Sequence, residues 1–357
     1  MMNCQAIYSW LGQPEESAVV AGDYVVWILP GCLLTMLFEC TKRFLSAEGI
    51  FNPMFYIILI TVVIHTVNLY VFVILFEFRI KAVAIITWIS YSLNFIMGQI
   101  YTNYWYEETH IVYIDILDPE PVYRIPEYMK YGVPSWLMML VEWWSYEILN
   151  IFSGWLGANA LATSIILMSI FDVVYSMPLG IAYAAISLIG HSLGEKWPQK
   201  AKTYAQAVYL TAIGVTAVSI TVFVIFKHRV VMIFTQSEEV IELFRWVLPL
   251  YTVWITTDMV QWASVGVIKA MGYQTYASAS NFICYWGITI PTAYIFIFYF
   301  NYDYMGIWMG IPIGSSTLMA VYLILICRAP WKKLSEMASS VVHIEEAEAS
   351  LHKHLLP

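Results

Sequence analysis

Charged residues are scarce in this sequence. Asp, Glu, Lys and Arg make up 12% of its 357 residues, whereas a soluble globular domain carries about 25%. Hydrophobic residues account for 60% and aromatic residues for 17%. Trp and Tyr favour the lipid–water interface because each joins an apolar ring to a polar tip. A soluble fold could not hide so much apolar surface from water, so the composition predicts an all-α, polytopic membrane protein.

The sequence also lacks the signatures of several other protein classes. Its formal net charge of -8 disfavours nucleic acid as a partner. The five cysteines show no CxxC pair, His65 and His191 lack partners at metal-ligand spacing, and no Walker, zinc or nucleophile-elbow motif occurs. Residues 1–9 show no basic start or cleavage site typical of a signal peptide. We therefore expect no enzyme activity, no cofactor and no metal site.

Long hydrophobic runs recur along the chain. A helix that crosses a bilayer needs roughly 20 mostly apolar residues, and about nine segments meet that requirement. Between the third and the fourth lies an acidic, proline-containing stretch, which indicates an exposed loop. The predicted spans are residues 23–46, 54–77, 81–104, 133–156, 160–190, 203–226, 242–270, 277–299 and 304–327.

The basic residues predict the orientation of these spans, because lysine and arginine favour the cytoplasmic side. If the first span runs from outside to inside, most of them fall in the inner regions, and the acidic loop and the C-terminus are cytoplasmic. The outer regions then hold only Arg79, Lys81, Lys227, Arg229 and Arg245.

Two stretches of the chain resemble each other. Residues 11–30 and 234–249 each contain a Gln, a polar residue and Glu-Glu, followed by Trp-(Ile/Val)-Leu-Pro at the start of a long span. Chance similarity between apolar stretches is the alternative, but the shared polar start favours a true internal repeat, which is typical of transporters.

The repeat predicts the domain organisation. The second copy has three more spans before its matched part, and their counterparts in the first copy would lie upstream of Met1. The complete design would be two lobes of six helices each. We therefore expect a partial N-terminal lobe of three helices at residues 1–105, a cytoplasmic linker loop at 106–132, a complete C-terminal six-helix lobe at 133–333 and a cytoplasmic tail at 334–357.

Four acidic residues stand out within the predicted spans, where a charge costs about 2.5–3.5 kcal/mol on insertion scales. They are Glu142, Glu147, Asp172 and Asp258. A carboxyl removed from water can bind and release a proton near neutral pH and can also attract an organic cation. Competition between the two is a minimal antiport mechanism. The alternative is that these acids only bond polar neighbours inside the bundle.

Two other patterns indicate structural roles. Glu39 precedes the basic residues Lys42 and Arg43 by one helical turn, which favours an ion pair. A small-xxx-small ladder on the last span favours close helix packing; its members are Gly306, Gly310 and Gly314.

Several of these segments resemble one transporter family. Residues 134–157, PSWLMMLVEWWSYEILNIFSGWLG, resemble the seventh helix of eukaryotic multidrug and toxic compound extrusion (MATE) transporters, which typically reads P-S-x-x-M-x-x-x-E-W-W-x-[FY]-E followed by S-G-x-L-G. MPLGIAYAAISLIGHSLGEKWPQKAK is similar to the next helix and loop, with His191 in place of the family's Asn. VLPLYTVWITTDMVQWASVGVIKAMGYQ is similar to the tenth helix, and LGQPEE and WILPGCL fit the entry to the fourth. The resemblance covers residues 11–333.

The resemblance implies a proton- or sodium-coupled exporter with two six-helix lobes around a central cavity, and in eukaryotes a proton antiporter for organic cations or metabolites. The family's important acids on the seventh and tenth helices match Glu142 and Asp258, and the second acid of the seventh-helix motif matches Glu147. The eighth-helix acid of animal members aligns with Ser169 in this chain, and Asp172 lies one turn later. This difference does not support an animal-type substrate preference.

The expected partners are therefore a small organic cation or metabolite, protons and the lipid bilayer, in the plasma membrane or a vacuolar or vesicular membrane. The family's first three helices have no counterpart here, so we expect an incomplete gene model or a true short form. Two alternatives stay open. One is a related flippase for lipid-linked sugars, although such proteins tend to have basic cavities. The other is a truncated, non-transporting membrane protein.

Overall fold

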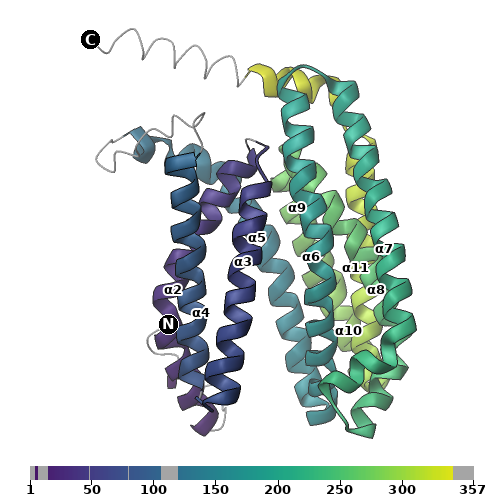
Figure 1. Cartoon of the computed structure of the whole chain (residues 1–357). Helices are drawn as coiled ribbons and strands as arrows, with labels where there is room; N and C mark the ends of the chain where they lie inside the picture. Colours follow the sequence, from purple (N-terminus) through teal and green to yellow (C-terminus); the bar gives the residue numbers. More distant parts are fainter. Residues whose placement is uncertain (1–4, 7–14, 48, 79, 106–119, 341–357) are drawn as a thin grey trace. The chain divides into compact units, whose positions relative to one another are not determined.

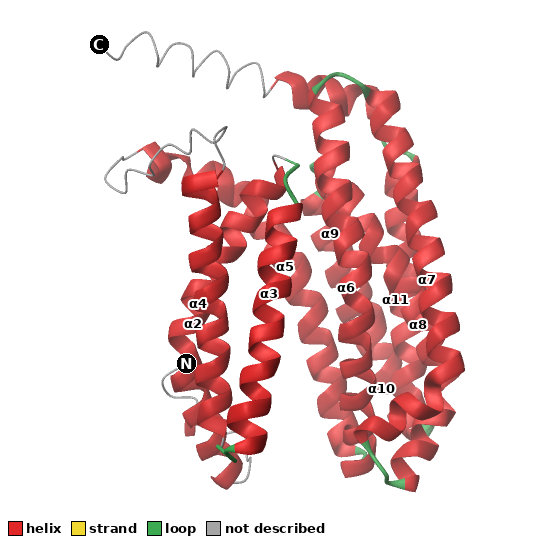
Figure 2. Ribbon diagram, viewed as in Figure 1, coloured by secondary structure: helices red, strands yellow, loops and turns green. Residues whose placement is uncertain are grey.

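The structure, a computed structural model, describes residues 5–6, 15–47, 49–78, 80–105 and 120–340. These residues are helical almost throughout, and no strand occurs among them (Figure 2). The predicted all-α fold is therefore confirmed for the described part of the chain. The chain divides into two compact units, Met1–Pro119 and Glu120–Pro357.

The first unit is built on α4, against which both α2 and α3 pack. A small apolar core lies between these helices and includes Phe38 and Leu45 of α2 and Met54 of α3. His65 Nδ1 of α3 lies 2.9 Å from Ser90 Oγ of α4, which adds a polar contact. The elements are α2 (Glu15–Ala47), α3 (Asn52–Leu69), the π-helix η1 (Tyr70–Leu75), α4 (Ile80–Ile100) and the π-helix η2 (Tyr101–Trp105).

The second unit is a larger helical bundle with one continuous apolar core. In Figure 1, α6, α7, α8 and α11 lie alongside one another, and α8 packs against the other three. The elements are α5 (Glu120–Trp155), α6 (Ala158–Gly194), α7 (Pro198–Phe234), α8 (Glu238–Ala270), α9 (Gln274–Asn281), the π-helix η3 (Phe282–Thr289), α10 (Ile290–Phe298) and α11 (Asp303–Cys327).

Helix α8 forms the centre of this bundle. From Thr257 to Ile268 every residue except Val260 is buried, as expected of a helix enclosed on all sides. Gly266 lets α6 approach closely, since a Cβ atom there would lie 2.6 Å from Ala182 Cα. The fold therefore holds the middle of α8, and Asp258 with it, away from the surface of the unit.

The glycine ladder on α11 is used for close packing, as predicted. A Cβ atom at Gly306 would lie 2.8 Å from the backbone nitrogen of Ile297, and one at Gly310 would lie 2.7 Å from Ala293 Cβ. Because α10 comes this close, larger residues would force the two helices apart.

Seven described helices are long and apolar enough to cross a membrane. The predicted spans 133–156 and 242–270 are also helical, in α5 and α8, but are not among the seven. Acidic residues together with Trp, Tyr and Gln lower the hydropathy of both. The seven are Gly22–Ser46, Asn52–Leu75, Ile80–Asn103, Ala158–Gly194, Pro198–Phe234, Gln274–Phe298 and Asp303–Cys327.

The structure differs from the predicted linker loop at 106–132. Helix α5 already begins at Glu120, so residues 120–132 are helical, and residues 106–119 lie outside the described residues. Pro121 contributed to the loop prediction, yet proline is tolerated in the first turn of a helix, where its missing N–H is not needed. In the predicted tail, residues 334–340 continue a helix that starts at residue 331, and residues 341–357 are not described.

Candidate functional site

Two of the four predicted acids lie inside the second unit. Glu142 is 1% exposed on α5, and Asp258 is 0% exposed on α8. Helix α5 packs against α6, α9 and η3, and α8 packs against α6, α7 and α11. Each carboxyl is therefore enclosed by several helices, and its polar contacts must come from their side chains.

Neutral side chains of three other helical elements, α8, α9 and η3, donate hydrogen bonds to Glu142. Its Oε1 accepts from Trp262 Nε1 at 3.2 Å and Gln261 Nε2 at 3.4 Å, both on α8. The hydroxyl of Tyr285 donates to the same oxygen at 3.1 Å, and Asn281 Nδ2 lies 3.4 Å from Oε2. These four donors compensate part of the cost of burying a carboxylate.

Asp258 has far fewer partners. The hydroxyl of Tyr146 lies 3.4 Å from its Oδ1, and its Oδ2 is a buried oxygen without a hydrogen-bond partner among the described residues. The ring of Tyr146 packs edge-on against Trp254, which stacks on Phe171 with ring centroids 4.5 Å apart. Asp258 thus lies in an aromatic environment with one polar contact.

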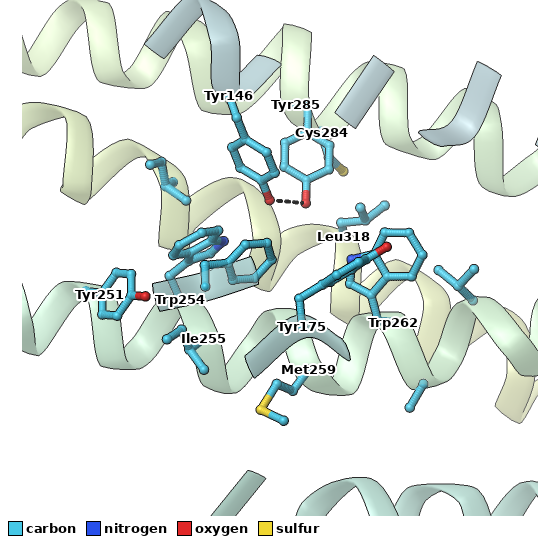
Figure 3. Close-up of a cluster of buried hydrophobic side chains, with 14 of the residues drawn as sticks. Tyr146, Tyr175, Tyr251, Trp254, Ile255, Met259, Trp262, Cys284, Tyr285 and Leu318 are labelled. Carbon is cyan, nitrogen blue, oxygen red and sulfur yellow. Dashed lines mark hydrogen bonds between the residues drawn. The ribbon is translucent and has the colours of Figure 1, made fainter. Parts of the chain in front are cut away.

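Two tyrosines lie between the two acids. The hydroxyl oxygens of Tyr146 and Tyr285 are 3.1 Å apart, and Figure 3 shows the two side chains next to each other with a hydrogen bond between their hydroxyls. Tyr285 belongs to the π-helix η3, where the Thr289 hydroxyl donates to the Cys284 carbonyl at 3.1 Å. Short π-helical segments frequently occur at functional sites.

A further set of contacts orients these side chains. Asn281 Nδ2 donates to the Met138 carbonyl at 2.8 Å, and the Tyr322 hydroxyl donates to Asn281 Oδ1. Trp286 Nε1 donates to the Val141 carbonyl at 3.0 Å. The bonds to Met138 and Val141 tie the α9–η3 segment to α5 in the turn that precedes Glu142.

Glu147 and Asp172 lie elsewhere. Both side chains are exposed, and the spacing of Glu147 from Glu142 explains its position, since five residues turn a helix by about 140°. Asp172 lies on α6 near a cavity of about 610 Å³ that is lined by apolar side chains of α6 and α7. The structure therefore brings Glu142 and Asp258 together and leaves the other two acids outside the pair.

Sequence reasoning missed Tyr146, Tyr285, Asn281, Gln261 and Trp262. A signal for them exists, because each lies on a helix close to another polar residue of the site. Tyr146 follows Glu142 by four positions, Tyr285 follows Asn281 by four, and Gln261 and Trp262 follow Asp258 by three and four. Residues at these spacings share a helix face, so the sequence contains the pattern that predicts a polar face on each of these apolar spans.

The arrangement allows proton chemistry at the two buried acids. Among the described residues, no group of three His, Cys, Asp or Glu side chains is placed to hold a metal ion. Two buried carboxyls within a network of neutral donors can change charge only by gaining or losing a proton. Each such change alters the electrostatics of the bundle interior, where charges are poorly screened.

Comparison with known proteins places these residues in a family context. The sequence profile of the MatE family matches residues 1–71 and 134–295. Multidrug and toxin extrusion protein 2 of Mus musculus is 25% identical over 339 residues, which cover 94% of this chain. Protein DETOXIFICATION 14 of Arabidopsis thaliana is 27% identical over 351 residues, 96% of this chain and 70% of that protein.

The fold is also shared with a solved structure. The crystal structure of the eukaryotic MATE transporter AtDTX14 matches with a TM-score of 0.86 at 24% identity, covering 96% of this chain and 76% of that one. The chain spans 58% of the length of the mouse protein. With seven helices able to cross a bilayer and these relatives, the chain is an integral membrane protein.

Proposed function

The chain belongs to the MatE family, and from that membership we propose that it is a secondary active transporter that exports organic cations or other small organic compounds in exchange for protons. The observation that carries the proposal is the buried pair Glu142 and Asp258, which contacts only neutral side chains through its described hydrogen bonds. Such a pair can take up a proton from one side of the membrane and release it to the other.

The surroundings of Glu142 support a proton rather than a sodium ion as the coupling ion. A sodium ion needs oxygen lone pairs directed at it, whereas Trp262 offers an indole N–H, which is a donor only. Gln261 and Asn281 also direct N–H groups at the carboxylate. A proton on Glu142 needs no such set of ligands.

The membrane arrangement that goes with this function has nine spans. We include α5 and α8 because each is longer than a bilayer crossing requires and because α8 lies at the centre of a bundle of membrane-crossing helices. The divisions at residues 105 and 333 and the cytoplasmic side for the loop and tail stay predictions. Labelling of introduced cysteines from either side of the membrane would decide the sidedness.

The substrate class rests on the relatives. The mouse protein is named for multidrug and toxin extrusion and the plant protein for detoxification, so we propose a small organic cation or metabolite, exported across the plasma membrane or a vacuolar or vesicular membrane. The flippase alternative predicts basic cavities, while the buried charges of the site described here are carboxylic.

The test is transport by the full chain in lipid vesicles with an imposed pH gradient and ethidium as the probe cation. Glu142→Gln keeps the shape of the side chain but cannot bind and release a proton. We expect gradient-driven ethidium exchange to fall by about 10²-fold, the scale of losing a positioned proton carrier. Asp258→Asn should also impair exchange, though less, since one acid remains.

Matched variants separate coupling from general damage. Glu147→Gln on α5 and Asp172→Asn on α6 make the same chemical change at exposed acids, and exchange should keep its dependence on the gradient. Exchange at the wild-type rate in Glu142→Gln would show that this carboxylate is structural and would end the proposal. Failure of the wild-type chain to exchange the probe would favour a non-transporting role.

A further inference from the structure

The two buried acids are joined by an unbroken path of hydroxyl groups. Glu142 Oε1 lies 3.1 Å from the Tyr285 hydroxyl, which lies 3.1 Å from the Tyr146 hydroxyl, and this lies 3.4 Å from Asp258 Oδ1. Figure 3 shows the central tyrosine pair with its hydrogen bond. The path runs from Glu142 of α5 to η3, returns to α5 at Tyr146 and ends on α8.

Counting hydrogens along this path limits its protonation. It has three links, and each tyrosine supplies one hydrogen. When both acids are ionised, Tyr285 donates to Glu142, Tyr146 donates to Asp258, and the link between the tyrosines has no hydrogen. One added proton on either carboxyl fills all three links. A second proton leaves one hydrogen without a place in the path.

We propose that the hydroxyls of Tyr146 and Tyr285 relay a proton between Glu142 and Asp258, so that the two acids share a single proton and pass it from one to the other. The proposal deepens the proposed function, because it concerns the same proton site. It does not require that the chain transports a substrate.

The transfer conserves every atom and charge. The carboxyl proton of Asp258 moves to the Tyr146 oxygen while the Tyr146 hydroxyl hydrogen moves to Tyr285. The Tyr285 hydrogen then moves to Glu142 Oε1. Both tyrosines end neutral, and rotation of their hydroxyls resets the path. Since O–H···O bonds are usually about 2.5–3.0 Å, the links must shorten by a few tenths of an ångström for transfer.

The partners of the two acids indicate which one holds the proton in this conformation. Hydrogen bonds donated to a carboxylate favour its ionised form, and Glu142 accepts four of them. Asp258 has one hydroxyl partner, and its Oδ2 has none. The shared proton therefore lies on Asp258, and release through the path delivers it to Glu142.

Other titratable groups surround the pair but use different partners. The Tyr251 hydroxyl of α8 donates to the Leu167 carbonyl at 2.8 Å, and the Tyr322 hydroxyl of α11 donates to Asn281 Oδ1. Tyr175 of α6 interacts electrostatically with both acids, whereas Asp172 of α6 is exposed. The path has one branch, because Gln261 Oε1 lies 3.3 Å from the Tyr285 hydroxyl.

The experiment follows both acids directly by rapid-mixing infrared difference spectroscopy on the full chain in lipid, without substrate. Glu142→Gln and Asp258→Asn identify the two carboxyl bands. After a jump from acidic to alkaline buffer, the loss of the Asp258 carboxyl band and the response of the Glu142 carboxylate band, as the shared proton leaves through Glu142, should follow one common rate constant in the wild type. Tyr146→Phe or Tyr285→Phe removes only the hydroxyl, and the two bands should then separate in rate by about 10²-fold.

A double variant and a control make the outcome specific. The two tyrosine links act in series, so the double variant Tyr146→Phe with Tyr285→Phe should be no slower than either single variant. Independent structural effects of the two substitutions would instead add. Tyr304→Phe removes another buried hydroxyl, bonded to Ser164 Oγ at 3.0 Å, and should keep the common rate. If one phenylalanine variant fails to fold, the other interrupts the same path.

Bands that keep one common rate constant in both phenylalanine variants would overturn the proposal, and so would effects that add in the double variant. These outcomes are independent of the transport assay. Unimpaired exchange in Glu142→Gln would refute proton coupling by this acid without changing the infrared result.

Discussion

An acid occupies the same place in both copies of the internal repeat, yet its surroundings differ. Glu39 of α2 lies nine residues after Pro30, and Asp258 of α8 lies nine residues after Pro249. The side chain of Glu39 is 44% exposed and forms ion pairs within its own helix. Asp258 is fully buried and has no described ion pair. Equivalent positions therefore carry acids of different kinds in the two units.

The next turn of each helix explains the difference. Three and four residues after Glu39 come Lys42 and Arg43, and both pair with it, as the sequence predicted. At the same distances after Asp258 come Gln261 and Trp262, which are neutral and donate to Glu142 instead. A basic residue one turn away stabilises the ionised form of an acid, as in the first copy. The neutral donors of the second copy leave the buried acids able to gain and lose a proton.

The largest effect is expected when the second copy is made like the first. Gln261→Lys places a base three residues after Asp258, where Lys42 follows Glu39. At about 4 Å an ion pair is worth roughly 4 kcal/mol at an effective dielectric constant of about 20, so the new charge holds a carboxylate ionised. Gradient-driven exchange in vesicles should fall to background.

The control for this change is Gln261→Met, which has a similar length and no charge. It removes the two long hydrogen bonds that Gln261 forms with Glu142 and Tyr285 and should cost about 1–2 kcal/mol in stability while leaving the dependence on the pH gradient. If Gln261→Lys transports as the wild type does, a base beside the buried acids does not affect exchange. The basic residues after Glu39 would then not explain the difference between the two copies.

The sequence was sufficient for the features that depend on neighbours along the chain. Apolar runs predicted the helices, the step from Glu39 to Lys42 and Arg43 predicted an ion pair, and motif similarity predicted the family. Each of these signals is local, because helix geometry fixes which residues three or four positions apart meet.

The features that the sequence did not predict depend on helices meeting in space. Tyr285 reaches Glu142 across 143 positions and Tyr146 across 139, and no spacing rule connects them. The start of α5 at Glu120 was missed because its prolines were taken as signals of a loop. Likewise, burial separates Asp258 from the exposed Asp172, although both are acids in apolar spans.

A smaller effect should show how closely α8 packs against α6. Gly266→Ala on α8 would place a methyl group 2.6 Å from Ala182 Cα, and overpacking of this kind typically costs about 1–3 kcal/mol. The midpoint of thermal unfolding in detergent should therefore fall. On α6, Gly180 has no atom within 4 Å of such a methyl group, so Gly180→Ala should leave the midpoint unchanged or raise it. Equal midpoints for the two variants would contradict the close crossing of α6 and α8.

The smallest effect is expected at the first copy of the acid. Glu39→Gln removes a carboxylate that is 44% exposed and paired with Lys42 and Arg43. Exposed ion pairs contribute about 0–1 kcal/mol, so the thermal midpoint should hardly move and exchange should keep its dependence on the pH gradient. Asp258→Asn, which makes the same change from acid to amide at the equivalent place in α8, should impair that exchange under the same conditions. Similar losses in the two variants would mean that transport needs a carboxylate at this place in both copies. Burial and neutral neighbours would then not distinguish an acid that couples transport from an acid that forms ion pairs within its own helix.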